Sequence, residues 1–260
     1  SRVLRTKEYR EFEAEMEQWI VPYAVYCHLR DKFGTSTFTK WPTASKYSRE
    51  QAEAMFNGKA RREIRFYCFV QYLLHRQLTA VSNEAARLGV ILKGDIPIGV
   101  NPDSVEAWTE PWLFHMDSAA GAPPDAFAAE GQNWGFPTYN WTMMAKDDYA
   151  WWRKRLNHMA RYFTAYRIDH VLGFFRIWQI PAGKAGRPVS GLLGQFAPSL
   201  PMSADEVASY GFRFEMERQT WPYVDSADKA LFVRDYKDIK LVHPRKAVQK
   251  SAAYRELDND

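Results

Sequence analysis

Two short apolar segments, each running into an aspartate, constrain the fold of this chain more than any other feature. Val90 to Leu92 leads into Asp95, and Thr164 to Ile168 leads into Asp169. Short apolar runs of this kind are typical of buried strands. Between them we predict an amphipathic helix from Asp147, which would cap it, to Phe163, so the order is that of a βαβ unit. We therefore expect an α/β fold in which both aspartates lie at the carboxyl ends of neighbouring parallel strands, where α/β barrels place their reactive groups.

The first part of the chain, residues 1–89, is predicted to be mainly helical. Lys7 to Phe33 has the composition of a helix, and we expect Pro22 to divide it because proline removes a backbone donor. Ser48 begins a capping box that opens a shorter helix, which Gly58 would close.

The clearest predicted helix runs from Arg61 to Leu88 and is stopped by Gly89. Apolar residues recur there at alternating spacings of three and four, which places them on one face. The stripe consists of Ile64, Tyr67, Gln71, Leu74, Leu78, Val81, Ala85 and Leu88. Gln71 interrupts it, and two interpretations stay open: a hydrogen bond to a neighbouring element, or a role at a binding cleft.

A long segment rich in glycine, proline, asparagine and aromatic residues, Val100 to Ala145, separates the two strands and contains one expected helical turn at Ser104 to Trp108. Loops of that length bind something or are disordered, and the tryptophans argue against disorder. Further along, we predict a strand at Ile177 to Ile180, a loop at Pro181 to Pro201, and a capping box that begins at Ser203.

Composition excludes the fibrous, disordered and membrane-spanning classes. Hydrophobic residues make up 46% of the 260 residues and charged residues 25%, and no apolar run has the length of a membrane span. The net charge of +4 gives no reason to expect a nucleic-acid partner. Aromatic residues reach 15%, which suits both a core and the stacking surfaces that sugars use.

The cysteines and the N-terminal segment indicate the compartment of the protein. Cys27 and Cys68 lack metal-ligand spacing and sit in apolar stretches, so we expect buried free thiols. Ser1 to Glu17 is highly charged and does not resemble a signal peptide. We therefore expect a soluble, cytoplasmic protein.

The chemistry of the second strand depends on Arg167 and Asp169, which share one face because side chains alternate along a strand. An arginine stabilises the ionised form of a neighbouring carboxylate, which suits a nucleophile better than a proton donor. The competing interpretation is an ordinary buried salt bridge.

The other candidates carry plainer alternatives. Asp95 is equally well explained as a helix cap or turn residue, and His170 as a core histidine facing away from Asp169. A metal site built from Asp95, Asp103 and His115 matches no ligand spacing, so we predict no metal.

Six motifs in one order resemble those of the 4-alpha-glucanotransferases called amylomaltases or disproportionating enzymes. They are residues 94–100 (GDIPIGV), 103–108 (DSVEAW), 121–127 (GAPPDAF), 131–141 (GQNWGFPTYNW), 166–174 (YRIDHVLGF) and 178–181 (WQIP). The residues of these motifs are most similar to those of the branch that contains the plant cytosolic enzymes and similar bacterial proteins. The resemblance is strong over about residues 90–200.

This resemblance implies a retaining transfer of α-1,4-glucan segments on a (β/α)8 barrel, with a maltooligosaccharide or α-glucan as substrate and no cofactor, nucleic acid or membrane involved. It assigns the nucleophile to Asp169 and its ionic partner to Arg167. Substrate binding falls to Asp95 and to Trp134, which would flank the acceptor and shield the intermediate from water. The resemblance adds further substrate-site residues: Gln132, Gly135, Pro137 and His170.

The match has a gap, because the family places an acid/base glutamate and a later His-Asp pair after the nucleophile. Neither motif follows Asp169, and Glu215 is the nearest substitute among Glu206, Glu215, Glu217 and Glu256. We expect residues 1–260 to form part of a single catalytic barrel domain: a helical part (1–89), a βαβ core with its substrate loop (90–181), and the start of an insertion (182–260). Such an incomplete, helix-rich barrel would need its remainder, a partner or self-association to cover its strand edges.

Two other functions compete with transfer. A hydrolase of the α-amylase type would use a similar aspartate and arginine but would release glucose without building longer chains. A non-catalytic glucan-binding or structural module would not need Asp169 at all.

Overall fold

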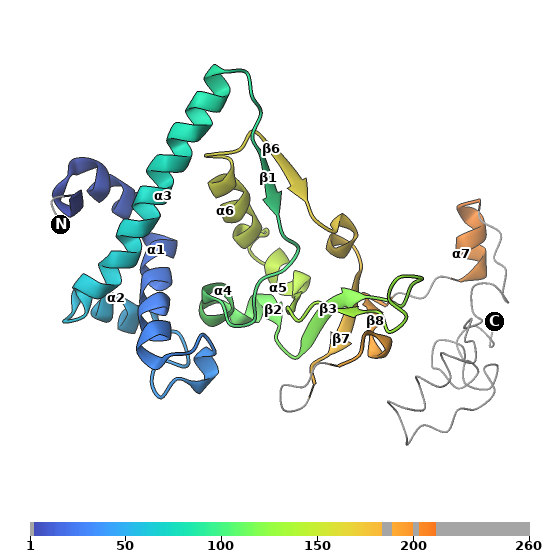
Figure 1. Cartoon of the computed structure of the whole chain (residues 1–260). Coiled ribbons are helices and arrows are strands. Elements are labelled where there is room, and N and C mark those ends of the chain that lie inside the picture. Colours follow the sequence, from blue (N-terminus) through green and yellow to red (C-terminus); the bar gives the residue numbers. More distant parts are fainter. Residues whose placement is uncertain (1–2, 184–188, 200–202, 212–260) are drawn as a thin grey trace. The chain divides into compact units, whose positions relative to one another are not determined.

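The computed structural model describes residues 3–183, 189–199 and 203–211 (Figure 1). The chain divides into two compact units, Ser1–Pro124 with Glu130–Phe196, and Asp125–Ala129 with Ala197–Asp260. In the described part of the second unit, α7 (Ala204–Ser209) begins with the predicted cap, in which Ser203 Oγ accepts from the backbone N of Glu206. Glu215, Glu217 and Glu256 lie outside the described residues. No helix in the described ranges is both long and apolar enough to cross a membrane.

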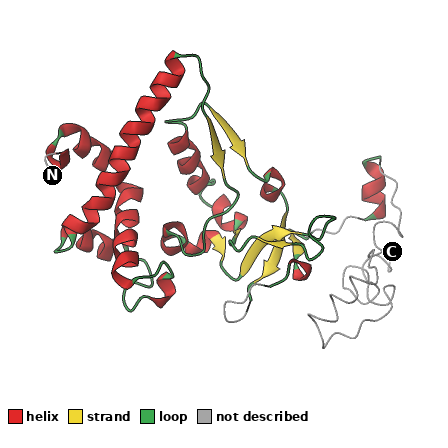
Figure 2. Cartoon of the chain, in the orientation of Figure 1, coloured by secondary structure: helices red, strands yellow, loops and turns green. Residues whose placement is uncertain are grey.

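Helices dominate the first part of unit 1, as predicted (Figure 2). A short 3-10 turn, η1 (Val3–Arg5), precedes α1 (Lys7–Phe33), which continues through Pro22, so the predicted division there is wrong. Pro22 and its neighbours Ile20 and Val21 are buried, and their packing offsets the missing backbone bond. α1 ends at Gly34, whose left-handed φ of 67° suits glycine.

A 3-10 turn, η2 (Phe38–Lys40), leads to α2 (Arg49–Asn57), and α3 (Arg61–Arg87) then packs against α1. The predicted caps of α2 are confirmed: the Ser48 hydroxyl accepts from the backbone N of Gln51, and Gly58 closes the helix. Gln71 donates to the hydroxyl of Tyr23 at 3.1 Å, which confirms the hydrogen-bonded interpretation of that residue.

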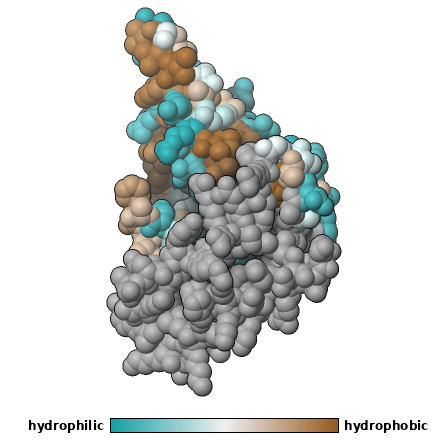
Figure 3. Space-filling model, turned by 90° about the vertical axis from the view of Figure 1, so that its right-hand side faces the viewer, coloured by the Kyte–Doolittle hydropathy of each residue, from teal (hydrophilic) through white to brown (hydrophobic). Residues whose placement is uncertain are grey.

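The apolar stripe of α3 is buried only in its first half. Ile64 is enclosed in the core shared with α1, whereas Leu74, Val81 and Leu88 are 50%, 55% and 60% exposed. The predicted helix is confirmed, and its apolar stripe is only partly buried because α1 contacts only part of it. The brown surface at the top of Figure 3 lies where α3 ends and the chain turns toward the strands.

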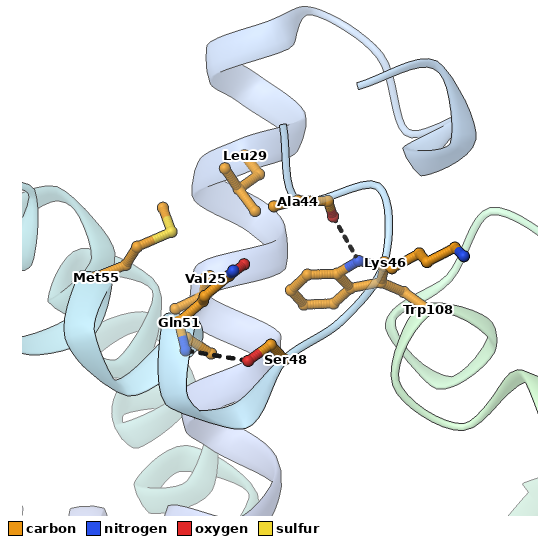
Figure 4. A pocket seen from close by; sticks show the side chains of 9 residues that line it. Val25, Leu29, Ala44, Lys46, Ser48, Gln51, Met55 and Trp108 are labelled. Atoms are coloured by element: carbon orange, nitrogen blue, oxygen red, sulfur yellow. Dashed lines mark hydrogen bonds between the residues drawn. The ribbon is translucent and has the colours of Figure 1, made fainter. Parts of the chain in front are cut away.

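α4 (Val105–Thr109) is the predicted helical turn, and it is capped by Ser104. Its Trp108 is buried and donates from Nε1 to the carbonyl of Ala44 at 2.9 Å, tying this turn to the loop before α2 (Figure 4). The cavity beside it, lined also by Val25 and Met55, has about 10 Å³ of free volume. This is room for about one water, so the cavity is a packing feature rather than a ligand site.

The two strands that carry the aspartates pair in parallel, as predicted. β1 covers Lys93–Ile96 rather than Val90 to Leu92, and β6 covers Ala165–Ile168. Among the described residues these two strands form a sheet of their own. α6 (Ala150–Met159) lies against one face, where the carbonyl of its Leu156 accepts from Tyr166, and the carboxylate of Asp147 accepts from the first backbone N of the helix.

β6 is not a buried strand, which corrects the prediction. Tyr166 and Ile168 are 36% and 46% exposed although they lie on the face of Gly94 and α6, because β6 has β1 on one side and no described strand on the other. The apolar composition of the segment therefore does not reflect burial within the described residues.

The segment between the strands is folded rather than a plain loop. It contains η3 (Pro111–Leu113), β2 (Phe114–His115), β3 (Ser118–Ala122), β4 (Gln132–Asn133), β5 (Thr138–Tyr139) and α5 (Trp141–Ala145). β7 (Ile177–Pro181), preceded by η4 (Val171–Phe174), confirms the predicted third strand. β8 (Gln195–Ala197), preceded by η6 (Gly191–Leu193), lies where we predicted only loop. The sheet order is β4-β3-β7-β8, and β2 pairs with β5.

Candidate functional site

One arginine joins both strand-end aspartates. Asp95 and Arg167 are partners in the β1–β6 register, and Asp169 follows two residues after Arg167, so all three side chains lie on the same face. Arg167 Nη1 donates to Asp95 Oδ2 at 2.8 Å, and its Nη2 donates to Asp169 Oδ1 at 3.1 Å. The backbone N of Asp169 also donates to the carbonyl of Ile96, which holds the end of β6 against β1.

These three side chains are open to solvent. The side chain of Arg167 is 57% exposed, and those of Asp95 and Asp169 are 59% and 47% exposed. The interpretation as a buried salt bridge is therefore wrong. Exposed ion pairs contribute only about 0–1 kcal/mol to stability, so folding gains little from this cluster. Asp95 is neither a helix cap nor a turn residue, because it lies inside β1.

The opposite face of the pair explains why the charges gather on one side. Gly94 is buried and faces the residues at the end of α6, where an added Cβ would lie 2.8 Å from the ring of Phe163 and 3.0 Å from Met159. Side chains there pack against the helix, so the polar residues of β1 and β6 point the other way. Alternation along two strands, paired in the register that sets Asp95 opposite Arg167, assembles the cluster.

His170 turns away from the regular strand. Its backbone has a left-handed φ of 48°, and it serves as the cap of η4. The imidazole is half-buried and meets the ring of Trp134 edge-on, with centroids 4.9 Å apart. His170 is thus not a core histidine: its ring joins the end of β6 to the loop that carries Trp134.

The loop residues predicted for substrate binding lie together around Trp134. The indole Nε1 donates to Gln132 Oε1 at 3.0 Å, and Gly135 adopts the left-handed φ of 74° that the turn requires. The backbone N of Gly135 donates to the side chain of Asn133, and Pro137 is buried where β5 begins. The structure therefore brings Trp134 into contact with Gln132 and with His170, and Gly135 forms the turn that follows Trp134.

The metal candidates are not gathered. Within the residues that the structure describes, no group of histidine, cysteine, aspartate and glutamate side chains could hold a metal ion. Asp103 instead accepts from the hydroxyl of Thr37 at 2.9 Å, and His115 lies in β2. Cys27 and Cys68 are buried free thiols, as predicted, and burial raises the pKa of both.

Sequence reasoning missed two residues of this site, Phe136 and Gly99. Phe136 stacks on Trp134, and Gly99 leaves the space in which the Phe136 ring sits. Both residues belong to the motifs quoted above. Their contact could not be predicted from the sequence, because Gly99 and Phe136 are 37 positions apart.

Comparison with known proteins gives a consistent result. Residues 2–253 match the family described as 4-alpha-glucanotransferase. The chain is 47% identical over 225 residues to 4-alpha-glucanotransferase DPE2 of Oryza sativa subsp. japonica, which covers 86% of this chain and 23% of that protein. It is 34% identical over 179 residues to the 4-alpha-glucanotransferase of Chlamydia pneumoniae, covering 69% of this chain and 34% of that protein.

A solved structure agrees with the sequence matches. The amylomaltase from Streptococcus agalactiae, determined in complex with acarbose, superposes with a TM-score of 0.65 at 26% identity, covering 87% of this chain and 46% of that chain. The chain thus spans less than half of the length of these relatives. Its mixed helix and strand fold is similar to that of the amylomaltase.

Proposed function

The chain belongs to the 4-alpha-glucanotransferase family, and on that premise we propose that it carries the nucleophile of a retaining transfer of α-1,4-glucan segments between maltooligosaccharides. The observation that carries this proposal is the exposed cluster of Asp95, Arg167 and Asp169 at the end of two parallel strands. Exposed carboxylates held in a fixed geometry by a shared guanidinium are suited to meet a substrate.

Asp169 is the nucleophile in this proposal. Its carboxylate attacks the anomeric carbon, the bond to the leaving glucan oxygen breaks, and an acid residue protonates that oxygen. The hydroxyl of an acceptor glucan then attacks the same carbon, its proton passes to the residue that acted as acid, and the Asp169 carboxylate is released. Two inversions give net retention.

Arg167 and Asp95 orient this chemistry. Arg167 fixes the carboxylate of Asp169 through one nitrogen and that of Asp95 through the other, so a sugar bound by Asp95 is held in register with the nucleophile. Trp134, which meets His170 beside the nucleophile, would stack on the acceptor sugar, and Gln132, Gly135 and Pro137 would shape its loop.

The proton donor is not part of this cluster, because both carboxylates accept hydrogen bonds from Arg167. Glu206 is the one remaining candidate of the four glutamates within the described residues, and it lies in the second unit. We propose that residues 1–260 belong to one catalytic (β/α)8 barrel domain, that the enzyme acts in the cytoplasm on glucans of the starch or glycogen type, and that its acid/base residue lies elsewhere in the enzyme.

A substrate with a leaving group that needs no protonation tests the nucleophile directly. We would incubate the chain with α-maltosyl fluoride and measure the intact mass, since fluoride departs without an acid. We expect one maltosyl group to be added and to be located on Asp169 by peptide mapping. The Asp169→Asn variant should gain no mass, whereas the control Asp117→Asn, an exposed turn residue, should gain it as the wild type does.

Maltotriose then separates the competing functions. We expect the 260-residue chain alone to produce little redistribution of chain length, and the protein at its natural full length to produce longer and shorter oligosaccharides together. Release of glucose without longer products would instead identify a hydrolase. Maltotriose binding without any adduct from the fluoride would identify a glucan-binding module and overturn the proposal.

A further inference from the structure

Trp134 is held by its backbone as well as by its indole. The backbone N of Trp134 donates to the carbonyl of Ala120 at 2.9 Å, and the backbone N of Ala120 donates to the carbonyl of Phe136 at 2.8 Å. The backbones of Trp134 and Phe136 are thereby both hydrogen-bonded to Ala120 of β3, with the left-handed Gly135 between them. The two rings consequently emerge from one short, rigid turn.

Phe136 and His170 are both ring neighbours of Trp134, but they meet it in different orientations. The two rings are stacked, with centroids 5.8 Å apart and an interplanar angle of 26°, whereas Trp134 meets His170 at 81°. Trp134 therefore has an aromatic neighbour from its own turn and another from the residue that follows Asp169. Its orientation relative to the nucleophile depends on both.

Gly99 decides whether Phe136 can lie there. A Cβ added at Gly99 would be 2.0 Å from Cδ2 and 2.3 Å from Cε2 of Phe136, and real Cβ atoms do not approach other atoms so closely. Gly99 lies three positions after the end of β1, the strand that contains Asp95. The Phe136 ring therefore packs against the segment that directly follows this strand. A chain of contacts thus runs from Gly99 through Phe136, Trp134 and His170.

We propose that Phe136, seated over Gly99, is the positioning residue that holds Trp134 beside the nucleophile and thereby favours transfer over hydrolysis. This inference rests on the proposed transferase function and deepens it. The glycosyl ester on Asp169 is broken by attack on its anomeric carbon, which releases the Asp169 carboxylate. Attack by an acceptor hydroxyl oxygen gives transfer, and attack by a water oxygen gives hydrolysis. In either case the proton of the attacking group passes to a carboxylate base. An indole fixed in place provides a stacking surface for the acceptor and excludes water, whereas a displaced indole does neither.

The first test measures the position of Trp134 without any need for activity. The 10 tryptophans would be labelled as 5-fluorotryptophan, and the ¹⁹F resonance of Trp134 assigned with Trp134→Phe. We expect Gly99→Ala and Phe136→Ala each to shift that resonance. The matched control is Gly194→Ala, whose Cβ would lie 2.0 Å from Nε1 of Trp178, so it should shift the resonance of Trp178 and leave that of Trp134 unchanged.

The second test measures the ratio of transfer to hydrolysis with maltotriose in the protein at its natural full length. We expect Gly99→Ala and Phe136→Ala each to lower that ratio by about threefold to tenfold, the range that corresponds to one aromatic pair, and to raise KM for the acceptor more than they lower kcat. Gly194→Ala should leave the ratio unchanged.

The double variant Gly99→Ala with Phe136→Ala distinguishes this route from general damage. If Gly99 acts only through the Phe136 ring, the double variant should equal Phe136→Ala alone, because the ring that clashes is gone. Additive effects, an unshifted Trp134 resonance, or an unchanged ratio in variants of a transferring enzyme would overturn the inference. A wild-type protein that neither transfers nor hydrolyses would instead overturn the proposed function, while the resonance test would still decide the positioning role.

Discussion

The helical region and the β1–β6 strand pair differ in how far they bury an isoleucine side chain. Ile64 of α3 is 0% exposed in the core that α1 and α3 share, whereas Ile168 of β6 is 46% exposed. The helices enclose their apolar side chains between two long surfaces, while β1 and β6 are covered by α6 on one face and present charges on the other. The buried core and the proposed reactive cluster thus belong to different regions, so each can be changed separately.

The largest effect should come from the open strand pair. Asp169→Asn removes the proposed nucleophile and should lower transferase activity of the full-length protein by about a thousandfold or more, because in the proposed mechanism no other group forms the glycosyl ester. Because the side chain is 47% exposed, the midpoint of urea unfolding should stay at the wild-type value. Chain-length analysis with maltotriose measures the first effect, and a large loss of stability in the variant would contradict the division between the regions.

The same substitution in the two regions should differ in its cost. Ile64→Ala should lower the free energy of unfolding by about 2–5 kcal/mol, since it leaves a cavity between α1 and α3. Ile168→Ala should cost under about 1 kcal/mol, because this side chain already contacts water. Urea unfolding of both variants measures the difference, and equal costs would show that β6 is as well enclosed as the helices.

A third prediction concerns pH at the contact of α1, α3 and α6. Burial, with Arg161 nearby, lowers the pKa of His75 and of His158 below the ordinary value of 6.5. Their neighbours are Glu15, which pairs with Arg161, and Tyr162, which bonds His75 Nδ1 at 2.8 Å.

A histidine whose folded pKa is depressed binds fewer protons in the folded state than in the unfolded state. Stability is therefore complete above about pH 6.5 and falls as the pH is lowered through that value toward the folded pKa. Thermal unfolding between pH 7.5 and pH 5, values chosen to span about one unit or more on either side of the ordinary pKa, should show this decline. The double variant His75→Gln with His158→Gln should flatten it, and an unchanged slope would place the titrating groups elsewhere.

The last prediction is a small effect on stability from the arginine of the cluster. Arg167→Met should change the free energy of unfolding by no more than about 1 kcal/mol, because both of its ion pairs are exposed. It should nevertheless slow adduct formation from α-maltosyl fluoride, since the carboxylate loses its fixed orientation. Unchanged adduct formation would show that Arg167 does not orient Asp169.

Local patterns predicted local structure well. The predicted caps at Ser48 and Ser203 are present, the helical turn after Ser104 forms, and Gly58 closes its helix, because these signals depend on residues within one turn. Pro22 misled the prediction, since packing on both sides of α1 outweighed one missing backbone bond.

Strand signals were less reliable, because burial of a strand depends on what covers it. The apolar run from Val90 to Leu92 is not part of β1, whose residues alternate between buried and exposed. The segment from Val100 to Ala145 folds into short strands that pair with β7 and with each other, and such pairings over long separations have no local signal.

The sequence by itself determined that two parallel strands would each bring an aspartate to one end of a βαβ unit, and that Arg167 would share a face with Asp169, because chain order and side-chain alternation fix both. Only the tertiary structure decided that one guanidinium bridges both carboxylates and that Phe136 finds its seat over Gly99. Those contacts join segments distant in the chain, and their existence depends on register and on the space that one missing side chain leaves.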